Sequence, residues 1–465
     1  MQAARTVSGV ARGDRRTARY LRTTFRLGRY CAMVTQGRTL PPPSSTPGRF
    51  GPAPGGEDGP FSRARWKSPV RGPWLTSVFG LVLLIGIPTE FLTGLISYAA
   101  YKPRLGGDPN PDHGLFGFYL FNWVTSPSWL YRVTEGVHVM LGLALVPVVL
   151  AKLWSVIPKL FVWPPWRTVA SLLERLSLVL VVGGVIFEMT TGILNIEYAN
   201  PISFYTGHFY GAWAFMAGFT IHICVRFAEM VRALRSRRFR TELRTGLADT
   251  TPEAVDSDLV ATEPAAPTIS RRGVLALVAG TSLTVFALTA GDAIGGVARR
   301  FALFGTHYRS PGVGANRFPV NKTAAHAGVT AAQTGPAWRL EIVGAQRVSL
   351  SREQLLAMPL TTAYLPIACT EGWSTVQHWT GVPLADLARL AGVSSATTSV
   401  LTSLDTGAVL LSAAQVAAPL SLLALKVNGA DLSMDHGYPA RVIVPSAPGI
   451  HNLKWMSRIT FGDRG

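Results

Sequence analysis

The chain has 465 residues, of which 48% are hydrophobic and only 15% charged. Soluble domains carry about 25% charged residues, so this composition excludes an ordinary soluble protein and predicts membrane-spanning segments. The formal net charge is +18, but the Lys and Arg residues cluster in particular segments. The charge is therefore typical of membrane topology, and we expect no nucleic-acid partner.

Residues 1–72 carry fourteen Lys and Arg residues and three acidic ones, with Pro- and Gly-rich stretches such as PPPSSTPG. Neither helical nor strand periodicity is present, which is typical of a disordered segment. The first thirty residues contain no apolar run, so we expect no ordinary cleaved signal peptide.

Five apolar stretches are long enough to cross about 30 Å of hydrocarbon as helices. They lie at 74–100, 128–151, 168–194, 205–230 and 273–293. We expect a four-helix membrane domain over 73–232, a cytoplasmic linker over 233–269 and a fifth helix within 270–299.

Basic residues predict the orientation of these spans in a bacterial plasma membrane. The N-terminal segment, the second-to-third connection and the stretch 225–272 hold most of them, whereas the other two connections hold few. Because Lys and Arg stay on the cytoplasmic side, the N-terminus is expected inside. An odd number of spans then places residues 300–465 outside.

The fifth span begins Ser270-Arg271-Arg272-Gly273-Val274-Leu275. This resembles a twin-arginine export signal placed inside the chain. The alternative is a pair of ordinary arginines at the inner end of a span. Because the twin-arginine route exports folded domains, often with a cofactor inserted, the resemblance implies a cofactor in the domain that follows.

Three histidines lie in the predicted spans, at His138, His208 and His222. A titratable residue at this depth is functional by default. The pattern resembles the four-helix cytochrome b subunits of formate dehydrogenases and nickel-iron hydrogenases, which implies a b-type haem with histidine ligands. The first span has no histidine, and only His138 and His208 share the outer half. We therefore expect one haem on that pair, with His222 a further candidate ligand and packing histidines the alternative.

Residues 300–465 consist of short apolar runs separated by Gly, Pro and Ser. The runs RLEIVG, TSVLTSL, GAVLLS and RVIVPS predict strands, and SREQLLAMP and ADLARLAG predict short helices. A segment of this length can bury a core of its own. We expect a mixed domain of helices and strands.

The three cysteines, Cys31, Cys224 and Cys369, are far apart and predict neither a disulfide framework nor a CxxC metal site. Cys369 opens the motif CTEGWS, which WTGVPL, DHGYPARVIVP and GIHNLKW follow in order. Over about 315–465 these motifs resemble the molybdopterin-binding domain of the sulfite oxidase superfamily. The cysteine motif is most similar to that of bacterial periplasmic methionine-sulfoxide reductase catalytic subunits.

The resemblance implies an α+β fold, a molybdenum–molybdopterin cofactor, and Cys369 as the thiolate ligand, since soft sulfur suits this metal. The pterin phosphate needs cationic and amide donors. The positions that match the family's cofactor contacts are Asn321, His436, Arg441, His451, Asn452 and Lys454. Arg441 and Lys454 adjoin apolar strand residues, which favours burial against an anion over a solvated surface charge.

One departure from the family bears on the substrate. Sulfite oxidases follow the ligand cysteine with an arginine-rich sequence, whereas this chain has Thr370-Glu371-Gly372-Trp373-Ser374. A carboxylate beside the metal would repel sulfite. A small neutral S-oxide or N-oxide is therefore the expected substrate, with sulfite oxidation an alternative. Glu371 is expected to donate a proton or to cap a helix start.

Together these features predict a membrane-bound molybdenum oxidoreductase that exchanges electrons through haem b with a quinone or a partner protein. One alternative is a haem-free anchor served by a soluble electron carrier. The other is a non-catalytic binding module that keeps the fold without the metal.

Overall fold

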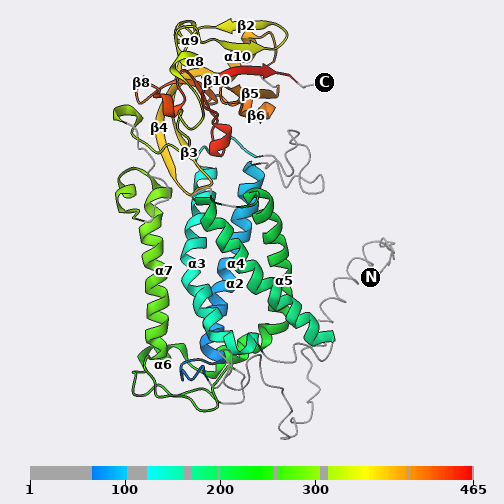
Figure 1. Ribbon diagram of the computed structural model, residues 1–465, viewed down its shortest axis with the longest axis vertical. Coiled ribbons are helices and arrows are strands. Elements are labelled where there is room, and N and C mark those ends of the chain that lie inside the picture. The colour runs from blue at the N-terminus through cyan, green and yellow to red at the C-terminus, as the bar shows by residue number, and fades with distance from the viewer. Residues whose placement is uncertain are drawn as a thin grey trace, which may run out of the picture.

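The computed structural model describes residues 65–101, 123–161, 169–196, 199, 201–254, 259–303, 313–394 and 397–462. Cys31 and nearly all of the predicted disordered segment lie outside these residues. Long helices form one end of an elongated molecule, and a domain of sheets and short helices forms the other (Figure 1).

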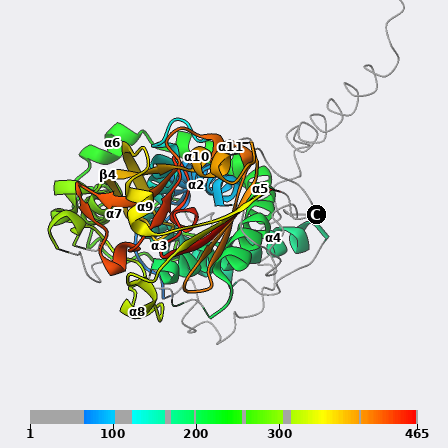
Figure 2. The same cartoon turned by 90° about the horizontal axis from the view of Figure 1, so that it is seen from above.

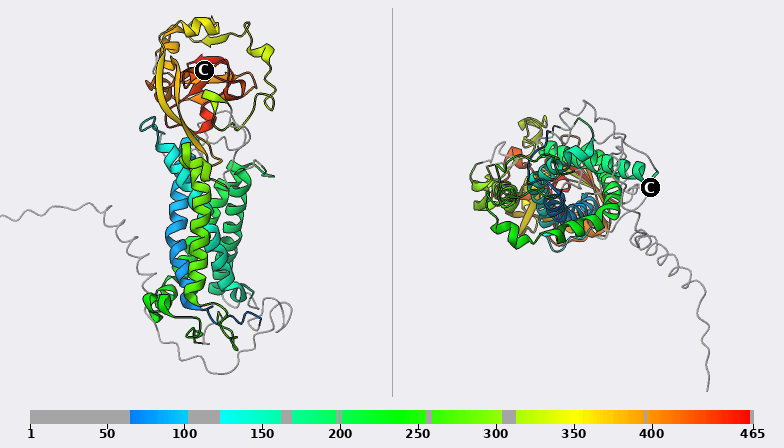
Figure 3. Two further views of the ribbon diagram at one scale, coloured as in Figure 1. Left: turned by 90° about the vertical axis from the view of Figure 1, so that its left-hand side faces the viewer. Right: turned by 90° about the horizontal axis from the view of Figure 1, so that it is seen from below.

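The described residues contain five helices long and apolar enough to cross a membrane. They are α2 (Pro73–Tyr101), α3 (Leu130–Leu160), α4 (Val169–Ile196), α5 (Phe204–Ser236) and α7 (Arg271–Ile294). The helix α2 packs on α3, α4 on α5, and α7 along α3, as a bundle (Figure 3). The five predicted spans are thereby confirmed as helices.

The outer surface of the bundle is apolar. Ile85, Val179 and Leu283, on three different helices, are 66–68% exposed. Such an apolar surface has a lower free energy in hydrocarbon than in water. A helix also satisfies its own backbone polar groups in hydrocarbon. Composition and surface therefore agree on a bundle that faces lipid.

The predicted linker is packed rather than extended. It contains α6 (Phe239–Arg244), and its Glu253 carboxylate accepts a hydrogen bond from the Trp74 amide at 3.1 Å. The Arg271 guanidinium, 1% exposed, donates to the Glu242 carboxylate at 3.3 Å and to the Thr251 carbonyl at 2.8 Å. Arg272 is exposed. Arg271 therefore ties the linker to the start of α7.

The part of the chain after α7, called the outer domain after its expected side of the membrane, is an α+β unit as expected. Its described residues form two five-stranded sheets. The first has the order β2-β1-β10-β5-β6, with β1 parallel to β10, and the second has the order β3-β4-β7-β8, with β9 on β7. The strands are β1 (Leu340–Val343), β2 (Arg347–Leu350), β3 (Thr361–Ala368), β4 (Ser374–Pro383), β5 (Ser399–Ser403), β6 (Ala408–Leu411), β7 (Leu422–Val427), β8 (Ala430–Asp431), β9 (Arg441–Ile443) and β10 (Met456–Phe461).

Short helices complete the domain: η1 (Gly296–Phe301), η2 (Gly314–Asn316), α8 (Ala331–Thr334), α9 (Arg352–Leu356), α10 (Leu384–Leu390), α11 (Ala413–Ala417), η3 (Met434–His436) and η4 (Gly449–His451). The main core contains Leu340, Leu401 and Leu423, all 0% exposed. Each sheet contributes its inward-facing alternate residues to it. The strands and helices expected from the sequence runs are confirmed.

The outer domain lies over the ends of the helices (Figure 2). The hairpin of β3 and β4 reaches down to them. Arg132 Nε on α3 donates to Ser374 Oγ at 2.9 Å, and Trp123 Nε1 donates to the Ser446 carbonyl at 2.6 Å. These contacts place the β3–β4 turn, and Cys369 with it, against the bundle.

Candidate functional site

Cys369 is the first residue after β3 and opens the turn into β4. Its amide donates to the Trp373 carbonyl at 3.0 Å, and the Gly372 amide donates back to its carbonyl at 3.0 Å. Gly372 has φ +92°, a conformation that favours glycine. The turn thus holds the thiol, which is 7% exposed, at the wall of a cavity of about 190 Å³.

The cavity collects side chains from several distant segments. Five of the six predicted cofactor contacts line it together with Cys369: Asn321, His436, Arg441, Asn452 and Lys454. The sixth, His451, is buried in η4 and is not among the lining residues. Trp373, which the sequence argument gave no role, also lines the cavity.

Two cations lie on this wall, of which Arg441 is buried and Lys454 is half-buried. Arg441, 4% exposed, donates to the carbonyls of His436 at 3.1 Å and Asn452 at 2.9 Å. Lys454 Nζ donates to the carbonyls of Lys322 at 2.7 Å and Asp435 at 2.9 Å. Asp405 and Asp435, which also line the cavity, oppose part of the charge of Lys454, whereas the Arg441 guanidinium donates to neutral carbonyls. A buried cation without a carboxylate partner is costly. The arrangement is typical of a site for an anion.

Two further atoms have unmet hydrogen-bonding capacity. His436 Nε2 and Arg441 Nε are buried and have no hydrogen-bond partner within the described part of the chain. Native structures leave few such groups without a ligand or water. The lining carboxylate Asp405 does not supply the missing acceptor, because it pairs with Lys322 Nζ at 2.8 Å. These groups fit a cofactor with anionic oxygens.

The protonation equilibria agree with that fit. Burial lowers the pKa of Lys454 to about 7 and that of Arg441 to about 9. Burial, with the charges of Arg441 and Lys454, lowers the pKa of His436 to about 3. Burial also raises the pKa of the Cys369 thiol to about 11. A bound anion would raise the pKa values of Lys454 and Arg441 again, so that both stay protonated. A bound metal would deprotonate the Cys369 thiol.

Glu371 does not line this cavity. Its carboxylate is 0% exposed and accepts a hydrogen bond from Trp373 Nε1 at 2.9 Å. No helix begins here, because the next element is the strand β4. The helix-capping alternative for Glu371 is therefore wrong, and its role as a proton donor stays a prediction.

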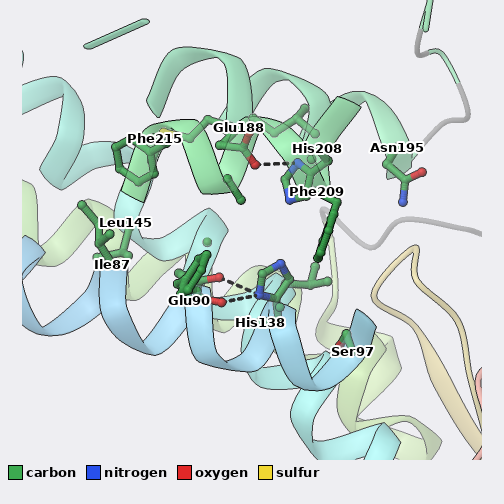
Figure 4. A pocket seen from close by; sticks show the side chains of 18 of the residues that line it. Ile87, Glu90, Ser97, His138, Leu145, Glu188, Asn195, His208, Phe209 and Phe215 are labelled. Atoms are coloured by element: carbon green, nitrogen blue, oxygen red, sulfur yellow. Dashed lines mark hydrogen bonds and ion pairs between the residues drawn. The ribbon is translucent and has the colours of Figure 1, made fainter. Parts of the chain in front are cut away.

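A second cavity, of about 250 Å³, lies among the helices below the turn and contains His138 and His208 in its wall (Figure 4). The two ring centroids are 6.3 Å apart. A metal midway between two imidazoles, with bonds of about 2.0 Å, needs a centroid separation of about 6 Å. His222 lines a different cavity, of about 260 Å³. The structure thus brings together the pair expected from depth alone.

Both histidines are held in the same way. His138 Nδ1 lies 3.0 Å from the Glu90 carboxylate and 3.1 Å from Thr93 Oγ1. His208 Nδ1 lies 3.1 Å from the Glu188 carboxylate and 2.8 Å from Thr191 Oγ1. These partners occupy Nδ1 and leave Nε2 for a ligand, as is usual for metal-binding histidines.

Glu90, Thr93, Glu188 and Thr191 were missed at the level of sequence. Their signal is the repeat E-x-x-T-G, which occurs in α2 from Glu90 and again in α4 from Glu188. The glycine of the first copy makes room for the ring, since a Cβ at Gly94 would lie 3.0 Å from His138 Cε1. The helical hairpins α2–α3 and α4–α5 therefore present the same constellation from opposite sides.

Comparison with known proteins identifies the outer domain. The family described as "Oxidoreductase molybdopterin binding domain" matches residues 326–465. An uncharacterized oxidoreductase, YuiH, of Bacillus subtilis is 32% identical over 128 residues, which are 27% of this chain and 65% of that protein. The protein-methionine-sulfoxide reductase catalytic subunit MsrP of Gluconobacter oxydans is 32% identical over 150 residues, 27% of this chain and 47% of that protein.

Mitochondrial sulfite oxidase of Macaca fascicularis is 29% identical over 156 residues, 26% of this chain and 29% of that protein. The chain thus covers between 29% and 65% of the length of these curated relatives. Residues 326–465 form a molybdopterin-binding oxidoreductase domain that is similar to parts of MsrP and sulfite oxidase.

The lowered pKa of Lys454 predicts a pH dependence of stability in cofactor-free protein. Between its folded pKa of about 7 and its unfolded value of 10.5, the unfolded chain binds more protons. The free energy of unfolding of the outer domain therefore rises with pH from 7 to 9, by at most about 1.4 kcal/mol per pH unit from this residue. Protein from a host without molybdopterin, unfolded at several pH values in detergent, measures this slope.

Lys454→Met is expected to flatten the slope, and Lys426→Met, on β7, serves as the matched control. An equal slope in Lys454→Met and the unchanged chain would contradict the assignment.

Proposed function

We propose that this chain is a membrane-bound molybdenum enzyme that transfers an oxygen atom between its cofactor and a small S-oxide or N-oxide, with electrons passing through a b-type haem between its helices. The observation that carries the proposal is that two cavities adjoin one turn. Cys369 lines the cationic cavity, and the next residue, Thr370, lines the cavity of the His138–His208 pair.

In this proposal Cys369 supplies the thiolate to molybdenum. Arg441 and Lys454 neutralise the phosphate of the pterin, and His436 Nε2 donates to or accepts from it. Asn452 also holds the segment after β9 in place, because its Oδ1 accepts a hydrogen bond from the Val444 amide at 2.7 Å. The bound cofactor supplies two-electron oxygen-atom transfer, while these residues bind it, orient it and exclude water.

The turn supports a neutral substrate. In the sequence, Glu371 and Trp373 stand where sulfite oxidases have arginines, and Trp373 lines the cavity while the Glu371 carboxylate accepts a hydrogen bond from Trp373 Nε1. Arg441 is the one arginine among the described lining residues, and we assign it to the cofactor. The similarity to MsrP, whose name specifies reduction of protein methionine sulfoxide, favours an S-oxide. Sulfite oxidation is the weaker candidate, since the other lining cation, Lys322, is paired with the Asp405 carboxylate at 2.8 Å.

His138 and His208 would hold the haem iron through their Nε2 atoms. Two observations support this: the 6.3 Å separation of the rings, and the Glu–Thr pair that occupies each Nδ1. A carboxylate on Nδ1 orients the ring and raises the basicity of the ligating nitrogen. The haem supplies one-electron steps, which a single molybdenum centre needs in order to exchange electrons with a carrier.

A membrane quinone is the electron partner that we propose. The cavity of His222 is mostly apolar and shares Ile87, Val149, Val185 and Phe215 with the haem cavity. His222 Nδ1 is buried without a partner among the described residues, and Lys152 also lines this space. These donors suit the carbonyl oxygens of a quinone ring that lies one layer of side chains from the haem.

We also propose the topology expected from the charges, with the N-terminus in the cytoplasm and the outer domain on the opposite side of a bacterial plasma membrane. Arg271 and Arg272 would act as the export signal for the folded domain. The buried contacts of Arg271 give it a packing role in addition.

The first test concerns Cys369. Cys369→Ser is expected to reduce sulfoxide-reductase activity to background, measured with dimethyl sulfoxide and reduced viologen, because an alkoxide is a poor donor to molybdenum. Membrane insertion and thermal stability should stay unchanged, as the side chains differ little in volume. Cys224→Ser, at an exposed position on α5, is the control and should keep full activity. Activity retained in Cys369→Ser would exclude this residue as the ligand.

The second test concerns the haem. The reduced-minus-oxidised absorption spectrum of purified protein should show about one haem per chain. His138→Ala and His208→Ala should lose it, whereas His222→Ala should retain it, because only the first two lie in the paired cavity. A ratio near two, or haem in either of the first two variants, would show that the ligands are assigned wrongly. The absence of haem in every preparation would favour a plain anchor.

The third test concerns export. Replacing both Arg271 and Arg272 by Lys should leave the first four spans inserted and keep residues 300–465 inside, as added protease would reveal. Glu242→Gln weakens the packing of Arg271 but keeps both arginines, so this control should export normally. An outer domain still accessible from outside in the double variant would reject the internal signal.

A further inference from the structure

The turn that carries the proposed molybdenum ligand also closes the outer end of the helical cavity. Thr370, the residue after Cys369, is among the residues that line the cavity of His138 and His208. Asn195 Nδ2 on α4 donates to the Thr370 carbonyl at 3.3 Å. Asn195 lies seven residues after Glu188, on the helix whose Glu188 and Thr191 hold His208.

The turn meets the other half of the cavity at Gly372. A Cβ at this position would lie 2.6 Å from Val139 Cγ1, and Val139 follows His138 directly in α3. The positive φ of Gly372 disfavours any other residue as well. Glycine is therefore the residue that lets the turn rest on the helix of His138 without a gap.

Ser374, at the end of the turn, is bonded to three separate segments. Its Oγ donates to the Ala293 carbonyl on α7 at 2.5 Å and accepts from Arg132 on α3. Its carbonyl accepts from Arg299 Nη2 at 2.6 Å. The turn is thus fixed to the bundle at both ends, and no hinge motion is needed to bring the two cavities together.

We propose that the turn Cys369–Ser374 is a fixed electron-transfer contact between the two cofactors, and that Gly372 and Asn195 are its positioning residues. This rests on the proposed function. Reduction of one S-oxide to its sulfide and water takes two electrons and two protons. The electrons cross the turn singly, each crossing oxidising the helical cofactor by one electron and reducing that of the outer domain by one. One quinol in the cavity of His222 replaces both electrons, is oxidised to the quinone and releases its two protons, and the solvent supplies the two protons that the water product needs.

The test uses the full-length holoenzyme in detergent and needs no substrate. Haem and molybdenum contents are measured first, and they decide the proposed function separately from this inference. A laser flash with a deazaflavin then reduces the haem rapidly, and its absorbance follows the electron exchange with molybdenum. In the unchanged protein we expect a fast phase that is independent of solvent viscosity, because nothing has to move.

Gly372→Val adds a side chain that must push the turn away from Val139. Because electron tunnelling weakens as the distance between two cofactors grows, we expect this phase to slow severalfold. The haem spectrum and midpoint potential should stay unchanged. Gly429→Val is the matched control: Gly429 has φ +82° in open space, so strain is introduced without a clash. Its rate should equal that of the unchanged protein.

Asn195→Leu removes the hydrogen bond to Thr370 at similar volume and should slow the same phase by a smaller factor. This variant decides the question if Gly372→Val does not keep its cofactors. An unchanged rate in a cofactor-loaded Gly372→Val or, failing that, Asn195→Leu protein would overturn the proposal. A rate in the unchanged protein that falls as sucrose raises the viscosity would also overturn it, because the carrier would then be mobile.

Discussion

The hydrogen bonds of Ser374 fix the position of the outer domain on the ends of the membrane helices. One hydroxyl and one carbonyl, both buried, join the β3–β4 hairpin to α3, to the end of α7 and to the segment beyond it. Charge-assisted bonds from Arg132 and Arg299 are stronger than neutral ones. The position of Cys369 relative to the helices, and the closure of the helical cavity by Thr370, both follow from this attachment.

Each cavity contains polar groups whose full set of partners is not present among the described residues. Around Cys369, cations rest on carbonyls, and the Arg441 Nε atom has no acceptor within the described residues. Around His138 and His208, both Nδ1 atoms are occupied, which leaves the Nε2 atoms for a ligand. Such groups cost stability in an empty protein. A ligand that supplies the missing partners would offset that cost.

The helices and many of the strands could be predicted because the signals are local. A run of about twenty apolar residues suffices for a span, and short runs between Gly, Pro and Ser suffice for the strands. The cofactor contacts came from motif resemblance, and five of the six line one cavity. Glu371 was placed beside the metal from adjacency alone. The structure turns its carboxylate to Trp373 instead, because neighbours in a tight turn point to different sides.

The sequence by itself determined the five helices, the α+β domain, the candidate cysteine ligand and the choice of His138 and His208 by depth. The tertiary structure decided how these parts combine. It showed that Glu90 and Glu188 hold the two histidines, that the linker packs through Arg271, and that Gly372 rests on Val139. Each of these contacts joins residues far apart in the chain, so its geometry depends on how whole helices and sheets pack. Local patterns of apolar and polar residues carry no information about those distances.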